Sequence, residues 1–240
     1  MTETDAPSED SAPSEDSAPS EDPAPSRRYG GRDKASRSAQ RRAALLAAGL
    51  ELFGTVGYPA SSVKKICDQA GLTERYFYES FTHRESLLIA VYDSQIEQVR
   101  TATLAALAAS EPELAPQAHA GVDAFVRTVA ADPRRARVIF IEVVGVSSAL
   151  EVHRRAVMHE FAQLIVGFAE SYFRIPATER LSIAAMLFAG GMTELMVDWT
   201  LAQAPLPLDE LIDVAVSILI DGLGTLARRP DEQRSPIVER

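Results

Sequence analysis

Hydrophobic residues recur at helical spacing along most of the chain after residue 36. Between Ser36 and Val56, apolar or small residues stand at offsets 0, 4, 7, 8 and 11 counted from Leu45. Because an α-helix repeats every ~3.6 residues, these positions share one helical face. The pattern predicts an amphipathic helix over 36–56, ended by the Gly57-Tyr58-Pro59 break.

Two short helices and several long ones follow. Ser61 or Ser62 is placed to cap a helix ending near Ala70, and Thr73 to cap one ending near Phe81. Longer helical patterns cover 84–109, 118–131, 133–147, 149–173, 178–203 and 208–229. Residues 138–146 are β-branched enough to form a strand, but no partner strand or hairpin signal accompanies them. The whole chain therefore predicts an all-α fold.

The first 26 residues differ from the rest. They repeat Ser-Ala-Pro-Ser-Glu-Asp and lack large apolar residues after Met1, so they cannot bury a core and are expected to be disordered. A basic stretch over 27–34, with two glycines, is expected to act as a flexible linker. Its arginines could reach a DNA minor groove or simply be solvated, and the acidic tail could compete with DNA or only aid solubility.

Composition narrows the class of protein. The 240 residues are 46% hydrophobic and 24% charged, as in an ordinary soluble chain, and the single cysteine cannot form an internal disulfide. The chain opens with acidic residues rather than a secretory signal, and its longest uncharged apolar run, 181–193, is shorter than the roughly 18 residues that span a bilayer. We expect a cytoplasmic protein with no membrane partner.

The net charge of −10 conceals three blocks of different sign. Residues 1–26 carry −8, residues 27–84 carry +6 and residues 85–240 carry −8. A basic island between acidic segments is compatible with a local nucleic-acid surface, although a merely solvated basic face is the commoner case.

The basic island contains the most informative motif, over 62–81. Small residues at Cys67 and Ala70, a permissive turn residue at Gly71 and an apolar plug at Leu72 allow two short helices to pack at a steep angle. These residues indicate a helix-turn-helix whose recognition helix covers 73–81. The small-residue role of Cys67 explains it without cysteine hydrolase chemistry.

Two departures from ordinary helix chemistry favour a DNA-binding role. Lys64 and Lys65 stand in the first turn of a helix, where the dipole disfavours cations by a few tenths to about 1 kcal/mol, a cost that a nearby phosphate reverses. Tyr76 and Tyr78 lie about 200° apart around a helix, so both cannot enter one core. At least one of these aromatic rings is available to DNA.

The stretch from Arg41 to Leu88 resembles the amino-terminal DNA-binding domain of TetR-family transcriptional regulators. The shared pattern is Phe53-Gly54-x-x-Gly57-Tyr58, Ser62, Ile66, Ala70-Gly71-Leu72-Thr73, Phe77-Tyr78-x-x-Phe81, and a basic residue before Glu85-x-Leu87-Leu88. The resemblance implies phosphate contacts by Ser62, Thr73, Tyr78 and Arg84, and base contacts by Arg75 and Tyr76. Ser80 and Cys67 depart from the residues usual in the family, which leaves the role of Ser80 open.

The resemblance also implies an organisation for the whole chain. A tail and linker over 1–35 would precede an N-terminal three-helix helix-turn-helix DNA-binding domain over 36–83. A C-terminal helical ligand-binding and dimerisation domain would cover 84–229, with a flexible tail over 230–240. The last two long helices would pair with a second copy, placing two recognition helices roughly 34–36 Å apart on double-stranded DNA.

The implied function is a ligand-released repressor that binds a palindromic operator as a homodimer. The helix over 84–109 is expected to couple ligand to DNA, because it leaves the DNA-binding motif and enters the ligand domain. An activator, or a regulator controlled by a partner protein, remains an alternative. A helical small-molecule enzyme is a remote one, and we expect no enzyme.

The expected effector is small and mostly apolar. Candidate pocket residues are acids embedded in apolar helices and large apolar side chains that could form walls. They are Phe140, Glu142, Phe168, Phe188, Met192, Glu194, Met196, Asp198 and Trp199. No cofactor or metal is expected, since His153 and His159 lack the i, i+4 spacing of helical metal ligands and no Gly-rich phosphate loop occurs.

Overall fold

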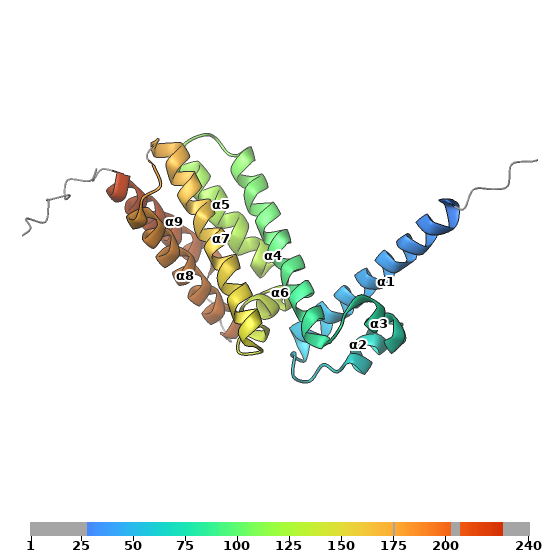
Figure 1. Ribbon diagram of the computed structural model, residues 1–240. Helices are drawn as coiled ribbons and strands as arrows, with labels where there is room; N and C mark the ends of the chain where they lie inside the picture. The colour runs from blue at the N-terminus through green and yellow to red at the C-terminus, as the bar shows by residue number, and fades with distance from the viewer. Residues whose placement is uncertain (1–27, 175, 203–206, 228–240) are drawn as a thin grey trace, which may run out of the picture. The chain divides into compact units, whose positions relative to one another are not determined.

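The computed structural model describes residues 28–174, 176–202 and 207–227, and within these ranges the regular elements are helices, with no strand. The elements are α1 (Arg28–Thr55), α2 (Val63–Ala70), α3 (Glu74–Ser80), α4 (Arg84–Ala109), α5 (Leu114–Ala130), α6 (Pro133–Arg137), η1 (Val138–Glu142), α7 (Ser148–Phe173), α8 (Glu179–Leu201) and α9 (Leu208–Ala227). The predicted all-α fold is confirmed (Figure 1). Residues up to Arg37 form a unit apart from Ser38 onward, and the account below concerns the second unit.

The first helix begins earlier than the sequence pattern predicts. Its first residue is Arg28 rather than Ser36, so the two glycines of the expected linker are helical. Extending an existing helix needs no new nucleus, and each glycine costs only about 1 kcal/mol in a helix interior. Arg28 and Arg32 therefore belong to α1, whereas Arg27, the acidic tail and the tail over 230–240 lie outside the described residues.

Helices α2 and α3 form the helix-turn-helix. The Ser62 hydroxyl caps α2 by accepting from the Lys65 amide at 3.3 Å. Gly71 ends α2 in the left-handed region, with φ +66°, a conformation that costs glycine little. Thr73 holds the cap position of α3 without a side-chain capping hydrogen bond, so its hydroxyl is not used in helix capping. Phe53, Ile66 and Phe77 are fully buried and fix the packing.

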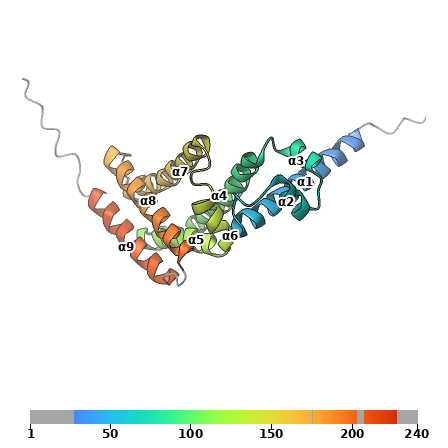
Figure 2. The same cartoon turned by 90° about the horizontal axis from the view of Figure 1, so that it is seen from below.

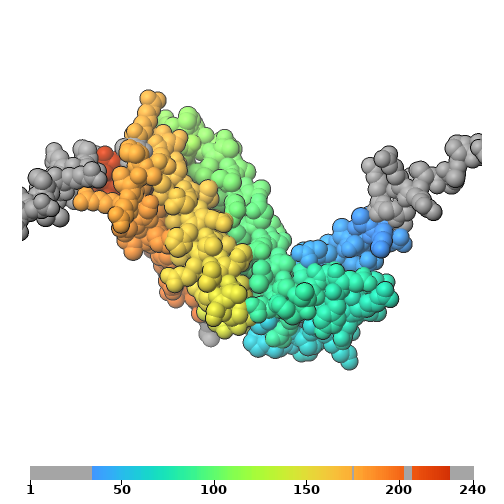
Figure 3. Space-filling view, in the orientation of Figure 1, coloured from blue at the N-terminus to red at the C-terminus, as the bar shows by residue number. Residues whose placement is uncertain are grey.

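Five long helices follow. Helix α5 packs against α4 and α9, and α8 packs against α7 and α9 (Figures 1 and 2). Figure 3 shows α4 and α7 side by side on one face, where Arg100 of α4 pairs with Glu160 of α7. Helix α5 starts at Leu114 rather than at the predicted residue 118, because Pro116 falls in its first turn, where a missing amide proton is tolerated.

The predicted helix over 133–147 is broken into two parts. Five residues of α-helix, capped by Asp132, lead into the single π-helical turn η1, and the chain then turns through Gly145 before α7. A π-turn adds a residue to the helical repeat and so changes which side chains face inward. Here Phe140 and Glu142 are both buried.

The last turns of α1 contact α6 very closely. A Cβ atom added at Gly54 would stand 2.4 Å from Arg134 Cβ and 2.6 Å from Arg134 Cα. A side chain at Gly54 therefore cannot be accommodated without moving backbone. This contact joins the DNA-binding helices to the larger helical domain.

We predict that Gly54→Ala lowers the free energy of unfolding by about 1–3 kcal/mol through overpacking. The matched control is Gly167→Ala in α7, where an added Cβ meets nothing within 4 Å. That change is expected to be neutral or stabilising by up to about 1 kcal/mol, because alanine is the better helix former. Urea titration of both variants measures the difference, and equal stabilities would show that the α1–α6 contact is not tight.

Candidate DNA interface and ligand cavity

Most predicted DNA-contacting residues are exposed on α2, α3 and the turn between them. Six side chains are exposed and two are half-buried, which fits a surface open to a partner. The exposed ones are Ser62, Lys64, Lys65, Thr73, Arg75 and Tyr78, and the half-buried ones are Tyr76 and Arg84.

The recognition helix holds its two tyrosines differently. Tyr78 is 57% exposed and rests edge-on against the buried Phe77 ring, so its hydroxyl points away from the core. The Arg41 guanidinium lies over the Tyr76 ring, 4.4 Å from its centroid. Arg75 is held by Glu79, with Nε 3.2 Å from the carboxylate oxygen. The tyrosines face different surroundings, as their spacing predicted.

Two basic side chains make contacts within the helix-turn-helix domain and are not directed to solvent alone. Arg84 donates to the Ser61 carbonyl at 2.9 Å and stacks over the Tyr58 ring at 4.1 Å. Lys65 donates through Nζ to the Ala60 carbonyl at 2.9 Å. These contacts fix the loop just before α2, a role that the sequence analysis did not assign to either residue.

Arg41 and Arg42 were missed as residues of this site. Arg42 lies over the Phe81 ring at 4.4 Å and is 3.4 Å from the Ser80 carbonyl, at the end of the recognition helix. Together with Arg41 over Tyr76, it ties α1 to both ends of α3. The only sequence signal was their position beside each other in an otherwise uncharged stretch of α1.

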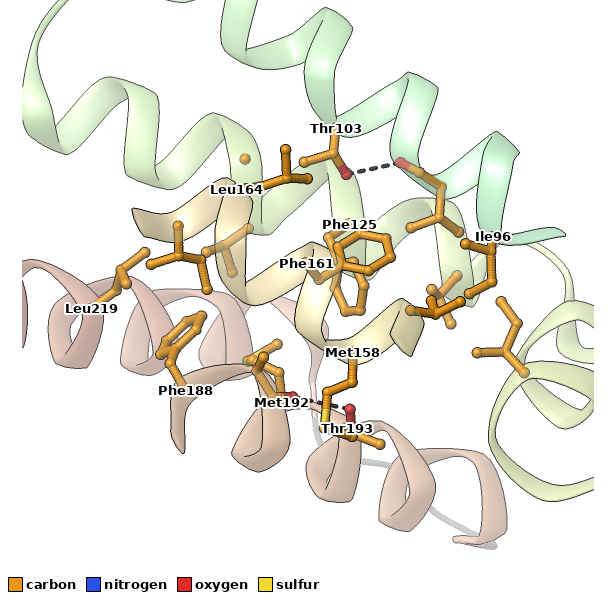
Figure 4. A pocket seen from close by; sticks show the side chains of 18 of the residues that line it. Ile96, Thr103, Phe125, Met158, Phe161, Leu164, Phe188, Met192, Thr193 and Leu219 are labelled. Carbon is orange, nitrogen blue, oxygen red and sulfur yellow. Dashed lines mark hydrogen bonds between the residues drawn. The ribbon is translucent and has the colours of Figure 1, made fainter. Parts of the chain in front are cut away.

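The larger domain contains a partly open cavity of about 150 Å³ between α4, α5, η1, α7, α8 and α9. Its walls are mostly aliphatic and aromatic, and Figure 4 shows the Phe125 and Phe161 rings together in the middle of the lining. Their centroids are 5.7 Å apart in an edge-to-face arrangement. A mostly apolar cavity with few polar groups is typical of small-molecule sites.

Four of the nine predicted pocket residues line this cavity: Phe140, Phe168, Phe188 and Met192. The other five do not. Glu194 and Asp198 are exposed on α8, Met196 is fully buried in the core, and Trp199 packs partly buried against that core. Glu142 is buried but faces the DNA-binding domain. Helical periodicity predicts which side chains face inward, but it does not distinguish a residue that lines a cavity from one that is packed on all sides, such as Met196.

Polar groups at the cavity are few. The Thr103 hydroxyl donates to the Val99 carbonyl at 2.8 Å, and the Thr193 hydroxyl donates to the Ala189 carbonyl at 2.9 Å (Figure 4). Both hydroxyls are thus used within their own helices. The remaining polar lining residues are Tyr92, Gln117 and Arg154. None of these three was predicted, because each looks like an ordinary helix residue and belongs to no sequence motif.

Glu142 joins the two domains. Its carboxylate accepts from the Tyr58 backbone amide at 2.6 Å and from Arg137 Nε at 2.7 Å. Arg137 also donates to the Thr55 carbonyl at 3.2 Å. We call Thr55, Tyr58, Arg137 and Glu142 the Glu142 joint. It fixes the end of α1 to the same π-turn whose Ile139 and Phe140 line the cavity.

A second ion-pair group supports the joint. Arg134 reaches Glu51 at 2.7 Å and Asp132 at 2.8 Å. Hydrogen bonds from Arg134 hold the pKa of Asp132 below its ordinary value, so Asp132 stays ionised as the cap of α6. Both groups lie where the domains meet, so α6 and η1, and not α4 alone, connect the cavity-bearing domain to α1.

Helix α8 carries an exposed apolar face. Ile183, Leu187, Leu195 and Leu201 are 43–72% exposed, and Val214 and Ile218 of the adjacent α9 are similarly open. By length and composition alone, α8 is also apolar enough to cross a membrane, with 22% of its most apolar window buried. The run over 181–193 counts uncharged residues only, and α8 continues past it, since Glu194 and Asp198 interrupt an otherwise apolar helix without ending it.

These features define a class of protein: a helix-turn-helix DNA-binding domain fixed to a helical domain that holds a small-molecule cavity. Residues 45–91 match the family model described as bacterial regulatory proteins, tetR family. This segment therefore belongs to the TetR family, as the resemblance predicted. Members of this family are transcriptional regulators and not enzymes.

Solved structures show the same fold over most of the chain. FadR of Bacillus subtilis in complex with stearoyl-CoA has a TM-score of 0.66 at 18% identity, covering 75% of this chain and 97% of its own. FadR of Bacillus halodurans, a fatty acid degradation regulator, has a TM-score of 0.65 at 18% identity, covering 79% and 97%. A transcriptional regulator of Pseudomonas aeruginosa PAO1 has a TM-score of 0.67 at 19% identity, covering 80% of this chain and 94% of its own. No curated protein matches the chain.

Within the described ranges, no three His, Cys, Asp or Glu side chains are grouped so as to hold a metal ion. Cys67 is buried in the helix-turn-helix. Burial, with Glu74 and Asp68 nearby, raises the pKa of its thiol, which disfavours the reactive thiolate. The residue is suited to packing rather than to nucleophilic chemistry.

We predict that Cys67 resists a thiol reagent at pH 8 in the folded protein. Its raised pKa reduces the thiolate fraction, and only locally opened molecules expose the sulfur, so labelling should be roughly a hundredfold slower than in urea. Stopped-flow labelling measures both rates, with Cys67→Ala as the background control. Equally fast labelling in the folded and unfolded states would contradict the buried position.

Proposed function

We propose that this protein is a cytoplasmic, ligand-released repressor that binds a palindromic operator as a homodimer. The observation that carries the proposal is the Glu142 joint, because one π-turn both lines the cavity and holds the end of α1. A ligand that displaces this turn is thereby able to change the position of the helix-turn-helix.

The proposed DNA contacts follow from exposure. Ser62, Thr73 and Tyr78 present hydroxyls, and Lys64 presents a charge, at the surface formed by α2 and α3. Phosphate contacts by such groups set the position of a protein on DNA, whereas Arg75 and Tyr76 would read base edges. Arg75 must exchange its Glu79 partner for a base when it binds. Arg84 and Lys65 would bind phosphate while holding the loop before α2.

The proposed dimer uses the exposed apolar face of α8 and α9. Six large aliphatic side chains exposed on two adjacent helices cost free energy in water, and a second copy covers them at a two-fold axis. This also accounts for the apolar character of α8 without a membrane. The two-fold arrangement presents two recognition helices to successive major grooves.

Release requires that the ligand bind one state more tightly than the other. Ile139 and Phe140 touch the cavity, and Glu142, two residues further on, holds Tyr58. A ligand that favours a shifted π-turn lowers operator affinity by its differential affinity for the two arrangements. The Bacillus subtilis FadR structure, which contains stearoyl-CoA, supports the view that this fold accepts ligands with a long apolar chain.

The direct test is selection of random duplex DNA with the full-length protein at two salt concentrations. Enrichment of a palindrome supports a dimeric DNA-binding regulator, whereas no enrichment, with or without residues 1–26, would contradict the proposal. Deleting the gene then separates repression from activation, since target transcription rises in the first case and falls in the second.

For the operator found in this way, we predict different effects of Tyr78→Phe and Arg75→Ala. Loss of a phosphate-binding hydroxyl should weaken binding by roughly 3–10-fold for all sequences, since one neutral hydrogen bond contributes about 1 kcal/mol. Loss of Arg75 should also relax base preference at one position of each half-site. Titration of operator variants measures both, with the exposed Tyr172→Phe on α7 as the control. Identical preference profiles for the two variants would refute these roles.

A further inference from the structure

The cavity has one end that is chemically unlike the rest. Tyr92 of α4 and Arg154 of α7 line the cavity near the starts of their helices. From them the lining continues along both helices to Leu107 and Phe168, about 20 Å away at a rise of about 1.5 Å per residue. Ile139 and Phe140 of the π-turn, which packs against α4, line the same cavity.

The Tyr92 hydroxyl is the unusual group. The side chain is only 2% exposed, yet its hydroxyl makes no hydrogen bond to any described part of the chain. Among the described side chains, every polar atom that is fully enclosed has a hydrogen-bond partner. The unpaired Tyr92 hydroxyl is therefore not fully enclosed, and the surface it keeps open is explained by the cavity that Tyr92 lines. Buried tyrosine hydroxyls ordinarily find a partner, which indicates that a ligand supplies one.

The surroundings decide what kind of partner fits. Burial raises the pKa of Tyr92, and Arg154 opposes this only in part, so the hydroxyl keeps its proton and acts as a donor. Arg154 uses Nε and Nη2 on Glu151, at 3.4 and 3.2 Å, which leaves Nη1 able to donate as well. Two donors at one end call for an acceptor on the ligand.

Nearby carboxylates do not oppose such an acceptor strongly. Asp93 pairs with His153 at 2.6 Å, Glu160 with Arg100, and Glu151 with Arg154. Each negative charge near Tyr92 thus has a basic partner. The end is suited to a carbonyl or carboxylate oxygen, whereas a ligand cation would meet the positive charge of Arg154.

We propose that the cavity binds an acyl compound whose carbonyl or carboxylate oxygen accepts from Tyr92 and Arg154, while its apolar chain follows α4 and α7. This inference rests on the proposed ligand-controlled function and names the ligand class and its anchoring residues. Because Ile139 and Phe140 line the same cavity, a ligand held there also contacts the π-turn that carries Glu142.

The test measures binding of three probes by calorimetry, without DNA: decanoate, methyl decanoate and decylamine. Decanoate or its ester should bind at least about tenfold more tightly than the amine, and the difference between the first two separates a free acid from an ester. Tyr92→Phe should weaken the better probe about tenfold, the loss expected for a hydrogen bond to a buried donor. Because the Tyr92 hydroxyl has no hydrogen-bond partner among the described residues, and phenylalanine keeps the ring that packs against His153, the variant should fold as stably as the unchanged chain.

Two controls make the outcome decisive. Tyr172→Phe repeats the chemical change on an exposed ring outside the cavity, and Gln117→Leu removes a polar group at the other end. Equal binding of acid and amine, no binding of any probe, or dependence on Gln117 instead of Tyr92 would overturn the inference. Tyr92-dependent binding that leaves operator affinity unchanged would uphold the ligand class and refute only the release mechanism.

Discussion

The attachment of the DNA-binding helices to the larger domain depends on one buried carboxylate. Glu142 is 8% exposed and receives the Tyr58 amide and the Arg137 guanidinium. An isolated charge at such a position would be costly, and pairing with hydrogen bonds on both oxygens offsets that cost. The arrangement is specific in geometry, because both donors must be in place for the charge to be tolerated.

This constraint explains several neighbouring features. The π-turn places Phe140 in the cavity wall while Glu142 faces α1. Gly54 lets α1 approach the Arg134 backbone, and Arg134 in turn pairs with Glu51. A change in the cavity therefore cannot move the π-turn without disturbing contacts that orient α1. Packed interfaces of this kind switch between discrete arrangements rather than deform continuously.

The sequence predicted the fold class and the helix-turn-helix well, because local rules determine them. Gly71 in the left-handed region, the Ser62 cap and the buried Ile66 and Phe77 all follow from spacing and residue type. Helix limits were less certain where a helix could extend past glycine, as at Arg28, or start before a proline, as at Leu114.

Long-range contacts lay beyond the sequence. Glu142 looked like a ligand residue because it is an acid in an apolar stretch, and only the fold reveals its partner Tyr58, 84 positions away. Tyr92 and Arg154 looked like ordinary helix residues, since nothing local shows that one hydroxyl lacks a partner. Phe140, Phe168, Phe188 and Met192 could be predicted as inward-facing, but a cavity is a property of several helices together.

The most direct test of the central claim is the effect of decanoate on operator affinity in the unchanged protein and in Glu142→Gln. The account predicts that decanoate weakens operator binding by a factor within roughly 5–150 in the unchanged protein, and that Glu142→Gln brings this factor close to one while both ligands still bind. Glu111→Gln, in the exposed loop between α4 and α5, serves as the control and should keep the full factor. An equal effect of decanoate in all three proteins would show that the Glu142 joint does not transmit the signal.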